Sequence, residues 1–534
     1  MIRASIEKGY PSKAILHYKS LLPSIHFHPD NRTLSFVLEA CKISKDLTTA
    51  LGTHARIIKS GFASDPSLLA SLVATYAESD YLDHARQVFD ETPEWGFSVL
   101  SANIVISGYL RMGEFGVANE VFRKLTSKDV VSWNTMIMGC VKNGRFKDGI
   151  SLFRKMLKLG FEPDGFSFAS VIKACGRLGA LCHGEWAHAL MVEKGIEVNY
   201  ILSSALIDMY SRCGKIGIAK NVFDTVCRDD VSVWNAMITG LASHGLASEV
   251  IAMFCRMEDE NVLPDSITFV GILTACSHCG LLEESQQFFE RMKREYLIEP
   301  ELEHYGAMID LLCRASQLNE VQRMIDSMPM KPDVVIWRSL LSACKTQGMS
   351  HLGEAALEKI EHLASGDYVL MSNIYSSTRR WDHAEIVREV MKRKGVRKNR
   401  GLSWIEMGGV IHQFKAGDRS HPESDAIYRG LEELIKLFKT NGFVPAMELV
   451  LMDVSEEEKE CNLSSHSEKL AAVYGIIKSS PGAEIRISKN LRTCYDCHSW
   501  MKMVSRVLHR VIIMRDRVRF HQFENGLCSC KDYW

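Results

Sequence analysis

The sequence has no long hydrophobic run, almost no net charge and few cysteines for its length. No apolar segment reaches the roughly 18 residues that a membrane span needs, because Asp, Lys or Arg interrupts every candidate. We therefore expect no membrane partner. The 64 Lys+Arg residues nearly balance 65 Asp+Glu residues, and the formal net charge of -1 argues against a protein that grips nucleic acid by charge alone. Any basic surface has to be local.

Sixteen cysteines in 534 residues are too sparse for a secreted disulfide scaffold, so we interpret them as thiols. Residues 1–22 lack both the apolar core of a secretory signal and the acid-poor Arg/Ser stretch of an organelle transit peptide. Hydrophobic residues make up 46% and charged residues 24% of the chain, which excludes a disordered protein and predicts a folded one with a large core.

Self-similarity dominates the first 400 residues. The segment VVSWNTMIMGCVKNG from Val130 returns in the same register as VSVWNAMITGLASHG from Val231, and the segment from Phe166 returns from Ile267. Within each unit, apolar residues recur at three and four positions, a small residue breaks the pattern, and a second amphipathic stretch follows. Each unit is therefore predicted to be a helical hairpin. One hairpin cannot bury its apolar stripes alone, so we expect an all-α solenoid of stacked hairpins.

Unit length and unit boundaries identify the kind of repeat. Units of about 35, 35 and 31 residues alternate from Val130, and several units close with Pro-Asp. With W-N-x-M-I at Trp133 and Trp234, this pattern resembles the pentatricopeptide repeat family, specifically its plant subclass with long and short variants. The resemblance implies an array over residues 1–333 whose first repeat is truncated, followed by two extension motifs over 334–399. It also implies that the chain begins inside the array, which would account for the missing transit sequence.

Helical repeats of this kind can read single-stranded RNA one base per unit, with two side chains carrying the choice. In the family these are the fifth and the last residue of a unit. The resemblance gives this role to three Asn and Asp pairs that look uracil-preferring and to one Ser and Asp pair that looks guanine-preferring: Asn103 with Asp129, Asn134 with Asp164, Asn235 with Asp265, and Ser204 with Asp230. The alternative is that Asn caps a helix and Asp fills a turn. Recurrence at matched register favours contact with RNA.

The repeat period stops after Asn399, where a basic run over residues 392–400 leads into a different composition. Taken alone, this run is typical of a solvated helix end. Beyond it, helical and strand patterns alternate, and Asn525-Gly526 marks a hairpin turn. The expected elements are a helix over 465–479, a strand over 483–490, a helix over 494–510 and a strand over 511–516. This order predicts an α/β domain over residues 400–534.

Two motifs in this domain have the spacing of a catalytic zinc site. His466-Ser467-Glu468 opens one expected helix, and Cys494-x-x-Cys497 opens the next. One imidazole and two thiolates can converge on a tetrahedral zinc whose fourth position stays open for water. Such a zinc makes hydroxide available near neutral pH, and Glu468 is placed to move protons without binding the metal. This is the arrangement of zinc nucleobase deaminases, although Thr493 stands where a proline usually precedes the first cysteine.

Two further cysteine clusters are less specific. Cys276-x-x-Cys279 occupies a small-residue position of a repeat, which favours packing over metal binding. Near the carboxyl terminus, two sulfurs and two imidazoles fit a closed structural zinc site, with inert surface thiols as the alternative. The four candidate ligands are His498, His521, Cys528 and Cys530. We therefore expect two zinc ions, one catalytic and one structural.

The last third of the chain closely resembles the DYW domain of plant organelle RNA editing factors. The segments that carry the resemblance are SWIE from Ser403, HSE, NLRTCYDCHS, RFHQF, CSC and the terminal Asp532-Tyr533-Trp534. The chain departs from the family at Arg400-Gly401, which replaces Pro-Gly, and at Gln522, which replaces a second histidine. Nine Lys or Arg residues face two Asp between Arg486 and Arg519, and this stretch is suited to phosphate contact unless its cations serve as helix ends and strand edges.

The resemblance implies a site-specific RNA cytidine deaminase of a mitochondrion or chloroplast, whose partner is single-stranded organelle RNA and not DNA. Organelle helper proteins are possible further partners. If the final short unit sits four nucleotides before the edited base, as the family implies, Asn235 with Asp265 reads U two nucleotides further upstream and Ser204 with Asp230 reads G beside it. The alternative is an RNA-binding guide or stabilising factor whose deaminase domain is silent or acts with a partner enzyme. An endonuclease would need metal-bridging carboxylates, which the sequence does not offer.

Overall fold

The computed structural model describes the chain except residues 25–26, 80, 92–98, 398–399, 448–462 and 534. Lys398 of the basic run, Asn399 at the expected domain boundary and Trp534 of the terminal tripeptide lie outside the described residues. The chain divides into two compact units: residues 1–175 with 190–197, and residues 176–189 with 198–534. In the described part of the chain, no helix combines the length and the apolar composition that crossing a membrane requires.

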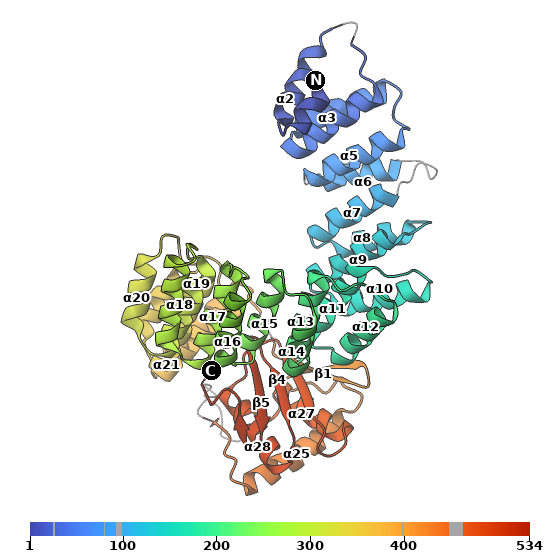
Figure 1. Cartoon of the computed structure of the whole chain (residues 1–534). Helices are drawn as coiled ribbons and strands as arrows, with labels where there is room; N and C mark the ends of the chain where they lie inside the picture. The colour runs from blue at the N-terminus through green and yellow to red at the C-terminus, as the bar shows by residue number, and fades with distance from the viewer. Residues whose placement is uncertain (25–26, 80, 92–98, 398–399, 448–462, 534) are drawn as a thin grey trace. The chain divides into compact units, whose positions relative to one another are not determined.

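The first unit consists of helical hairpins that follow one another along the chain (Figure 1). Its helices are α1 (Ile2–Glu7), α2 (Pro11–Leu21), α3 (Asn31–Ser44), α4 (Leu47–Lys59), α5 (Pro66–Glu78), α6 (Leu82–Glu91), α7 (Val99–Arg111), α8 (Phe115–Lys124), α9 (Val130–Lys142) and α10 (Phe146–Lys158). Helices α11 (Gly165–Leu178) and α12 (Leu181–Glu193) contribute residues to both units.

The second unit continues the hairpins and then changes to an α/β domain. Its hairpin helices are α13 (Tyr200–Arg212), α14 (Ile216–Thr225), α15 (Val231–Ser243), α16 (Ala247–Asp259), α17 (Ser266–Cys279), α18 (Leu282–Arg294), α19 (Leu302–Arg314), α20 (Leu318–Ser327), α21 (Val334–Gln347), α22 (Ser350–Glu358), α23 (Ser365–Ser377) and α24 (Trp381–Arg393). The α/β domain contains β1 (Leu402–Met407), β2 (Val410–Lys415), α25 (Ser424–Thr440), α27 (Ser467–Lys478), β3 (Ile485–Lys489), α28 (Tyr495–Val507), β4 (Ile512–Arg515), β5 (Phe520–Glu524) and β6 (Leu527–Cys528).

The repeated sequence produces repeated packing. In the first unit the indole of Trp133 meets the ring of Phe122 edge-on at 4.9 Å between centroids, and in the second unit Trp234 meets Phe223 in the same way at 4.9 Å. The interplanar angles are 80° and 79°. Each W-N-x-M-I opening thus buries its tryptophan against the second helix of the preceding hairpin, which is how a hairpin covers its neighbour's apolar stripe.

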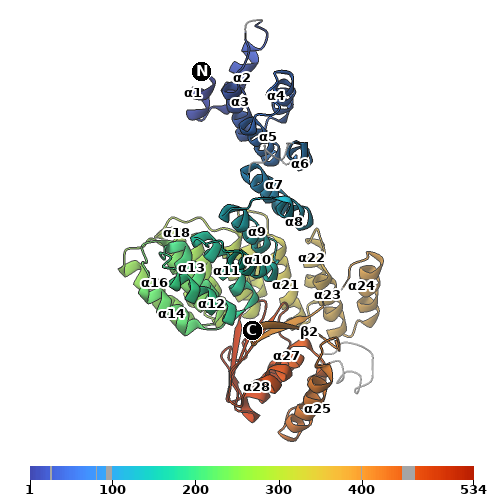
Figure 2. The same ribbon diagram turned by 90° about the vertical axis from the view of Figure 1, so that its right-hand side faces the viewer.

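The α/β domain is built on one mixed sheet with the strand order β2-β1-β3-β4-β5-β6. Only β3 and β4 run parallel among the described pairs, and α28 makes the crossover between them. Helices α25, α27 and α28 lie on the side of the sheet turned away from the repeat helices of the second unit (Figures 1 and 2). Their core contains Ile405, Ile487, Trp500, Met514 and Phe523.

Strand alternation separates the two faces of this sheet. On β3 and β4, Ile485, Ile487, Ile512 and Met514 point into the helical core. The residues between them point to the opposite face, as the period of two requires. The predicted fold class, a helical-hairpin solenoid followed by an α/β domain, is confirmed, and the Asn525-Gly526 turn joins β5 to β6 with positive φ at both residues.

Candidate metal centres and nucleic-acid interface

His466, Cys494 and Cys497 converge at the start of two helices. The Nδ1 atom of His466 lies 3.5 Å from Cys494 Sγ and 3.3 Å from Cys497 Sγ. In a tetrahedral zinc site, bonds of about 2.3 Å to sulfur and about 2.05 Å to nitrogen separate neighbouring ligand atoms by about 3.5 Å. The three side chains therefore fit one zinc ion. The ligand-type atoms of these residues and of Glu468 all lie within 4.8 Å of one another.

Helix N-termini hold both halves of this cluster. His466 is the N-cap of α27, and Cys494 is the N-cap of α28, where its sulfur accepts a hydrogen bond from the backbone N–H of Cys497 at 3.4 Å. The Cys497 thiol and His466 lower the pKa of Cys494 to about 5, although burial opposes them. The positive end of α28 acts in the same direction. A cysteine that ionises below neutral pH is ready to bind a metal without a large proton cost.

Glu468 sits beside this cluster and is 1% exposed. Its Oε1 atom accepts a hydrogen bond from Lys489 Nζ, and its Oε2 atom accepts one from Ser467 Oγ at 3.1 Å. Burial acts to raise the pKa of Glu468, but Lys489 and His466 outweigh it, so the pKa lies below its ordinary value. The buried carboxylate is therefore held ionised and close to the metal-binding atoms.

Sequence reasoning did not identify Lys489 as a partner of Glu468. Ile485, Ile487 and Lys489 alternate along β3, and all three are buried. A lysine that continues the core-facing series of a strand needs an anionic partner, because an unpaired buried ammonium is very costly. That pattern was available in the sequence, but the identity of the partner was not.

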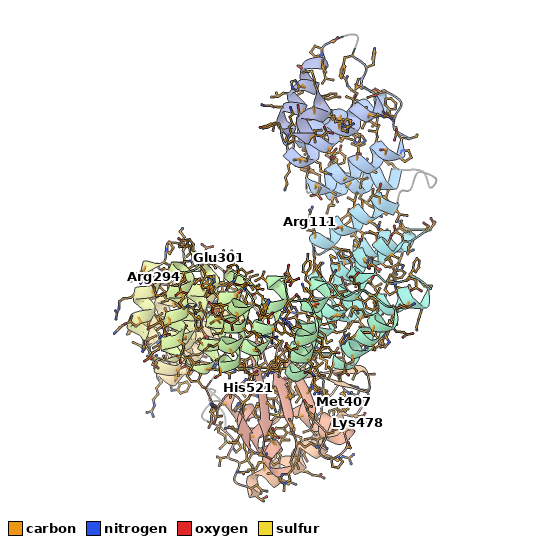
Figure 3. All side chains as sticks on the ribbon, in the orientation of Figure 1. Arg111, Arg294, Glu301, Met407, Lys478 and His521 are labelled. Carbon is orange, nitrogen blue, oxygen red and sulfur yellow. The ribbon has the colours of Figure 1, made fainter. Side chains whose placement is uncertain are left out.

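The second cluster joins α28 to the terminal strands. His498 lies on α28, His521 on β5 (Figure 3), and Cys528 on β6, with Cys530 shortly after it. His498 Nε2 is 3.2 Å from Cys530 Sγ, and His521 Nδ1 is 3.7 Å from Cys528 Sγ. All four residues are buried, and their ligand atoms lie within 4.8 Å of one another. Four buried donors in this arrangement fit a closed zinc site and not a set of surface thiols.

Asp516 links the two clusters and was not predicted either. Its Oδ2 atom lies 3.5 Å from His521 Nε2, on the side of the ring opposite the sulfur of Cys528, and accepts a hydrogen bond from the backbone N–H of Thr493 at 3.1 Å. Burial opposes ionisation, but the contact with His521 lowers the pKa of Asp516 to about 2. A carboxylate behind a ligating histidine is a common way to orient the ring. The N–H that binds Asp516 also explains why Thr493 suits this position, since proline has no N–H.

The Asn and Asp pairs proposed to read bases are bonded to each other. Asn134 Nδ2 donates to Asp164 Oδ1 at 2.9 Å, and Asn235 Nδ2 donates to Asp265 Oδ1 at 2.9 Å. Each Asp also accepts a backbone N–H of the following helix, at 2.9 Å from Ser167 and at 2.9 Å from Thr268. The Asn residues therefore do not cap a helix, as the alternative had it, whereas the two Asp residues cap the helices that follow them. Capping fixes the Asp carboxylate where the Asn reaches it.

The remaining two pairs differ in detail. Burial acts most strongly on the pKa of Asp129 and raises it. Hydrogen bonds to the Asp129 carboxylate, including one from the Asn103 amide, outweigh burial and lower this pKa. Asn103 Oδ1 is buried and has no hydrogen-bond partner among the described residues. Ser204 Oγ donates to Tyr200 O at 2.7 Å, and Asp230 caps α15 through Ser232 N at 2.8 Å. The Asn and Ser residues thus lie at the fifth position of α7, α9, α13 and α15, and each Asp directly precedes the first helix of the next hairpin.

Most of the described cations in the basic stretch from Arg486 to Arg519 bond to other groups of the protein. Arg510 donates to Ser479 O and Ala483 O, and Arg506 donates to Asn441 O at 2.8 Å. Lys502 pairs with Asp532 at 2.6 Å. Arg517 is exposed. The cations of this stretch therefore contribute little open phosphate-binding surface.

In the other cysteine motif, Cys276 is buried in α17 and Cys279 Sγ donates to Gly245 O at 3.1 Å.

Models of known protein families match several parts of the chain. The model of the DYW family of nucleic acid deaminases matches residues 442–534. The E motif matches residues 350–406, and the E+ motif matches 411–436. Models of the pentatricopeptide repeat match residues 101–130, 128–177, 229–278, 267–297 and 303–331.

Relatives and solved structures extend the match to the whole chain. A pentatricopeptide repeat-containing protein of Arabidopsis thaliana is 53% identical over 506 residues, covering 95% of this chain and 95% of that protein. Another, named as chloroplastic/mitochondrial, is 40% identical over 540 residues, covering 98% of this chain and 79% of that protein. The crystal structure of the pentatricopeptide repeat protein PPR10 with an 18-nucleotide psaJ RNA element matches with a TM-score of 0.59 at 17% identity, over 74% of this chain and 59% of that chain. The chain therefore belongs to the pentatricopeptide repeat proteins that carry E and E+ motifs and a carboxyl-terminal deaminase domain of the DYW family.

Proposed function

We propose that the protein is an RNA editing enzyme that converts a specific cytidine to uridine in an organelle transcript. In this proposal, residues 1–333 bind the single-stranded RNA upstream of the target, 334–399 connect, and 400–534 deaminate. The observation that carries the proposal is the cluster of His466, Cys494 and Cys497, whose spacing matches a three-ligand zinc site, with a buried Glu468 beside it. The relatives named for chloroplasts and mitochondria support an organelle location.

The residues of the cluster divide the work of hydrolytic deamination. His466, Cys494 and Cys497 would hold a zinc ion, which when bound would lower the pKa of its water so that hydroxide is available near neutral pH. Glu468 would take one proton from the attacking water and give it to the ring nitrogen of cytosine as the C4–O bond forms. It would then carry the proton of the new C4 hydroxyl to the amine, so that the C4–N bond breaks and ammonia leaves. Lys489 and Ser467 hold both carboxylate oxygens, so that Glu468 stays ionised and oriented before substrate arrives. The second cluster, with His498, holds the terminal strands to α28 as a structural site.

The hydrogen bonds of the reading pairs support selection of bases by the repeats. In the pairs of Asn134 and Asn235, the amide oxygen accepts from Ser167 or Thr268, and the amide nitrogen donates to Asp. This network fixes the amide orientation, so that a base meets a defined set of donors and acceptors. A short side chain fixed in this way can distinguish Watson–Crick edges at about 1 to 3 kcal/mol per pair, by analogy with direct readout of DNA.

The decisive experiment uses the full zinc-loaded chain and a short RNA with G and U at the predicted positions before a cytidine. We expect the wild-type protein to convert that cytidine and Glu468→Gln to lose roughly 100-fold or more of the rate, because the proton carrier is gone. Glu423→Gln, which removes a carboxylate from the exposed pair with Lys478, is the matched control and keeps the rate. Replacing the predicted G or U should weaken RNA binding roughly 5- to 100-fold, whereas replacing the base opposite unit 165–199 should not.

Three results would contradict the proposal in different ways. Conversion that persists in Glu468→Gln would show that Glu468 is not the proton carrier, and RNA binding without conversion by the wild type would make the protein a guide for another enzyme. RNA binding that does not change when the predicted G or U is replaced would remove the reading roles of Ser204 and Asn235.

A further inference from the structure

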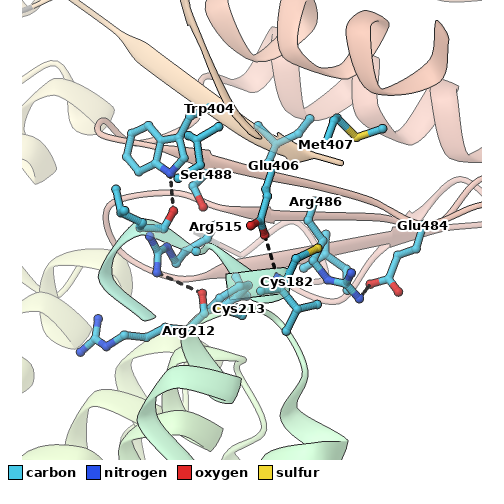
Figure 4. A pocket seen from close by; sticks show the side chains of 17 residues that line it. Cys182, Arg212, Cys213, Trp404, Glu406, Met407, Glu484, Arg486, Ser488 and Arg515 are labelled. Carbon is cyan, nitrogen blue, oxygen red and sulfur yellow. Dashed lines mark hydrogen bonds and ion pairs between the residues drawn. The ribbon is translucent and has the colours of Figure 1, made fainter. Parts of the chain in front are cut away.

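One face of the deaminase sheet is packed against the repeat helices of the second unit. Trp404 Nε1 donates to Leu178 O at 2.5 Å (Figure 4), and both carboxylate oxygens of Glu406 contact residues at the start of α12. The backbone N–H of Cys182 donates to Glu406 Oε2 at 2.9 Å, and His183 Nδ1 lies 2.5 Å from Glu406 Oε1. Trp404 and Glu406 flank Ile405, which points into the helical core on the other face. Period-two alternation of β1 therefore gives the domain a second buried face.

The turns inside four consecutive hairpins make this contact, and each turn contains a glycine: Gly179, Gly214, Gly245 and Gly280. These glycines are called the turn glycines below. A Cβ atom at Gly214 would lie 2.7 Å from Ile513 Cγ2, and one at Gly179 would lie 2.7 Å from Ser488 Oγ. Gly144 occupies the same place in an earlier hairpin, with φ of +70°, and has nothing within 4 Å. The close approach is therefore a property of the hairpins that meet the deaminase domain.

Arg515 is the polar anchor of this surface. Its Nη1 atom donates to Gly176 O at 2.8 Å and to Arg212 O at 3.0 Å, and its Nη2 atom donates to Arg177 O at 2.8 Å. These carbonyls are at the carboxyl ends of α11 and α13, where backbone acceptors are unpaired and the helix dipole is negative. Arg519 repeats the contact at α17 by donating to His278 O at 2.8 Å. Guanidinium groups at successive helix ends fix both the distance and the direction of the contact.

The same helices carry the proposed reading residues at their other ends. On α13, Ser204 precedes Arg212 by eight residues, which is about 12 Å along the axis. On α15, Asn235 lies near the start, and His244 at the end stacks on Phe520 with 4.1 Å between ring centroids and an interplanar angle of 6°. Each helix is therefore a short rigid rod from a base-reading position to the deaminase sheet.

The anchor is also joined to the proposed active site. Arg515 is followed by Asp516, which binds the N–H of Thr493 next to Cys494. On the neighbouring strand β3, Arg515 is paired with Ser488. Ser488 precedes Lys489, which donates a hydrogen bond to Glu468. Arg515 and Ser488 are therefore each followed directly by a residue that holds part of the candidate zinc site.

We propose that the turn glycines and Arg515 form a docking surface that fixes the active site relative to α13 and α15 and thereby selects which cytidine is edited. The inference rests on the proposed editing function. Arg515 is a positioning residue in this scheme, and it touches neither substrate nor metal. The repeats choose the bases, and the docking surface sets the spacing from those bases to the reacting cytidine.

A designed disulfide tests whether the docked state is the editing state. The Cβ position at Gly179 lies 3.9 Å from Ser488 Cβ, within the range of about 3.5 to 4.5 Å that disulfides use. We expect Gly179→Cys with Ser488→Cys to cross-link in the zinc-loaded chain under mild oxidation, as peptide mass spectrometry would show. Gly144→Cys with Ser488→Cys is the matched control, because it places a cysteine in an equivalent turn with positive φ that has nothing within 4 Å. The single variant Ser488→Cys shows whether the new cysteine pairs with native Cys182 instead. The cross-linked protein should edit the same cytidine as the wild type.

A second variant separates positioning from catalysis. We expect Arg515→Met to keep its metal content and to bind RNA within roughly twofold of wild type, yet to lose tenfold or more of editing at the target or to edit neighbouring cytidines. Failure of the cross-link, loss of editing that a reductant restores, or unchanged editing by Arg515→Met would each overturn the inference. A wild-type protein that edits no cytidine would instead overturn the proposed function, and the positioning role would fall with it.

Discussion

At the scale of single residues, Asp516 is the side chain on which most of the carboxyl-terminal chemistry depends. It faces His521 of one cluster and binds the backbone next to Cys494 of the other. We expect Asp516→Asn to lower the affinity of the second cluster for zinc roughly 10- to 100-fold, because the ring of His521 loses its orienting charge. Competition with a chelator, followed by metal analysis, measures this loss.

Asp418→Asn is the matched control for Asp516, since the carboxylate of Asp418 accepts hydrogen bonds from the backbone and hydroxyl of Ser420 in an exposed turn. It should leave both metals bound as tightly as in the wild type. Equal zinc affinity in the two variants would show that His521 needs no orienting carboxylate.

At the scale of elements, the placement of α27 on the sheet depends on one glycine. A Cβ atom at Gly475 would lie 2.8 Å from Ile405 Cδ1 and 2.9 Å from Ile485 Cγ2. We expect Gly475→Ala to destabilise the domain by about 1 to 3 kcal/mol, because the added methyl group forces apart a packed helix and sheet. Gly217→Ala in α14 is the control, because its Cβ meets nothing within 4 Å and alanine favours a helix. Chemical unfolding midpoints compare the two, and a stable Gly475→Ala would mean that α27 can move without loss.

At the scale of the whole molecule, the repeats and the deaminase domain of the second unit share buried groups that respond to pH. His278 ends α17, is 5% exposed, and its backbone carbonyl accepts a hydrogen bond from Arg519. Burial lowers the pKa of its ring to about 4, and the nearby cations Arg519 and Arg314 act in the same direction, while the carbonyl of Ala242 and Asp310 oppose them. Between pH 4 and 6.5 the unfolded chain binds the extra proton, so stability rises with pH in this window.

Because of this pKa shift, His278 accounts for up to about 3 kcal/mol of the free energy of unfolding that is lost as the pH falls from 6.5 to 4. His278→Asn keeps an N–H for the carbonyl of Ala242 and should flatten the pH dependence by that amount. His351→Asn, at a side chain that is 93% exposed, is the control. Unfolding free energies measured at several pH values test this expectation. Parallel curves for His278→Asn and wild type would show that His278 does not cause the pH dependence.

The sequence by itself determined the features that depend on local pattern. Hairpin periodicity and Pro-Asp closings predicted the solenoid, because each repeat forms from contacts within itself and with its neighbours. The ligand set proposed for a catalytic zinc could be predicted as well, because H-x-E and C-x-x-C each fall within about one helical turn. The strands β1 and β2 and helix α25 were covered in the sequence only by a family resemblance, since their pairing joins segments that are distant along the chain.

Tertiary structure alone decided which buried charges meet. Lys489 could be recognised as a buried cation, but only the parallel strands and α27 bring it to Glu468. The basic stretch looked like a phosphate surface until folding directed Arg515 and Arg519 to carbonyls at the ends of repeat helices. Local pattern fixes which face of an element is apolar, whereas the partner of a polar side chain depends on how separate elements pack against one another.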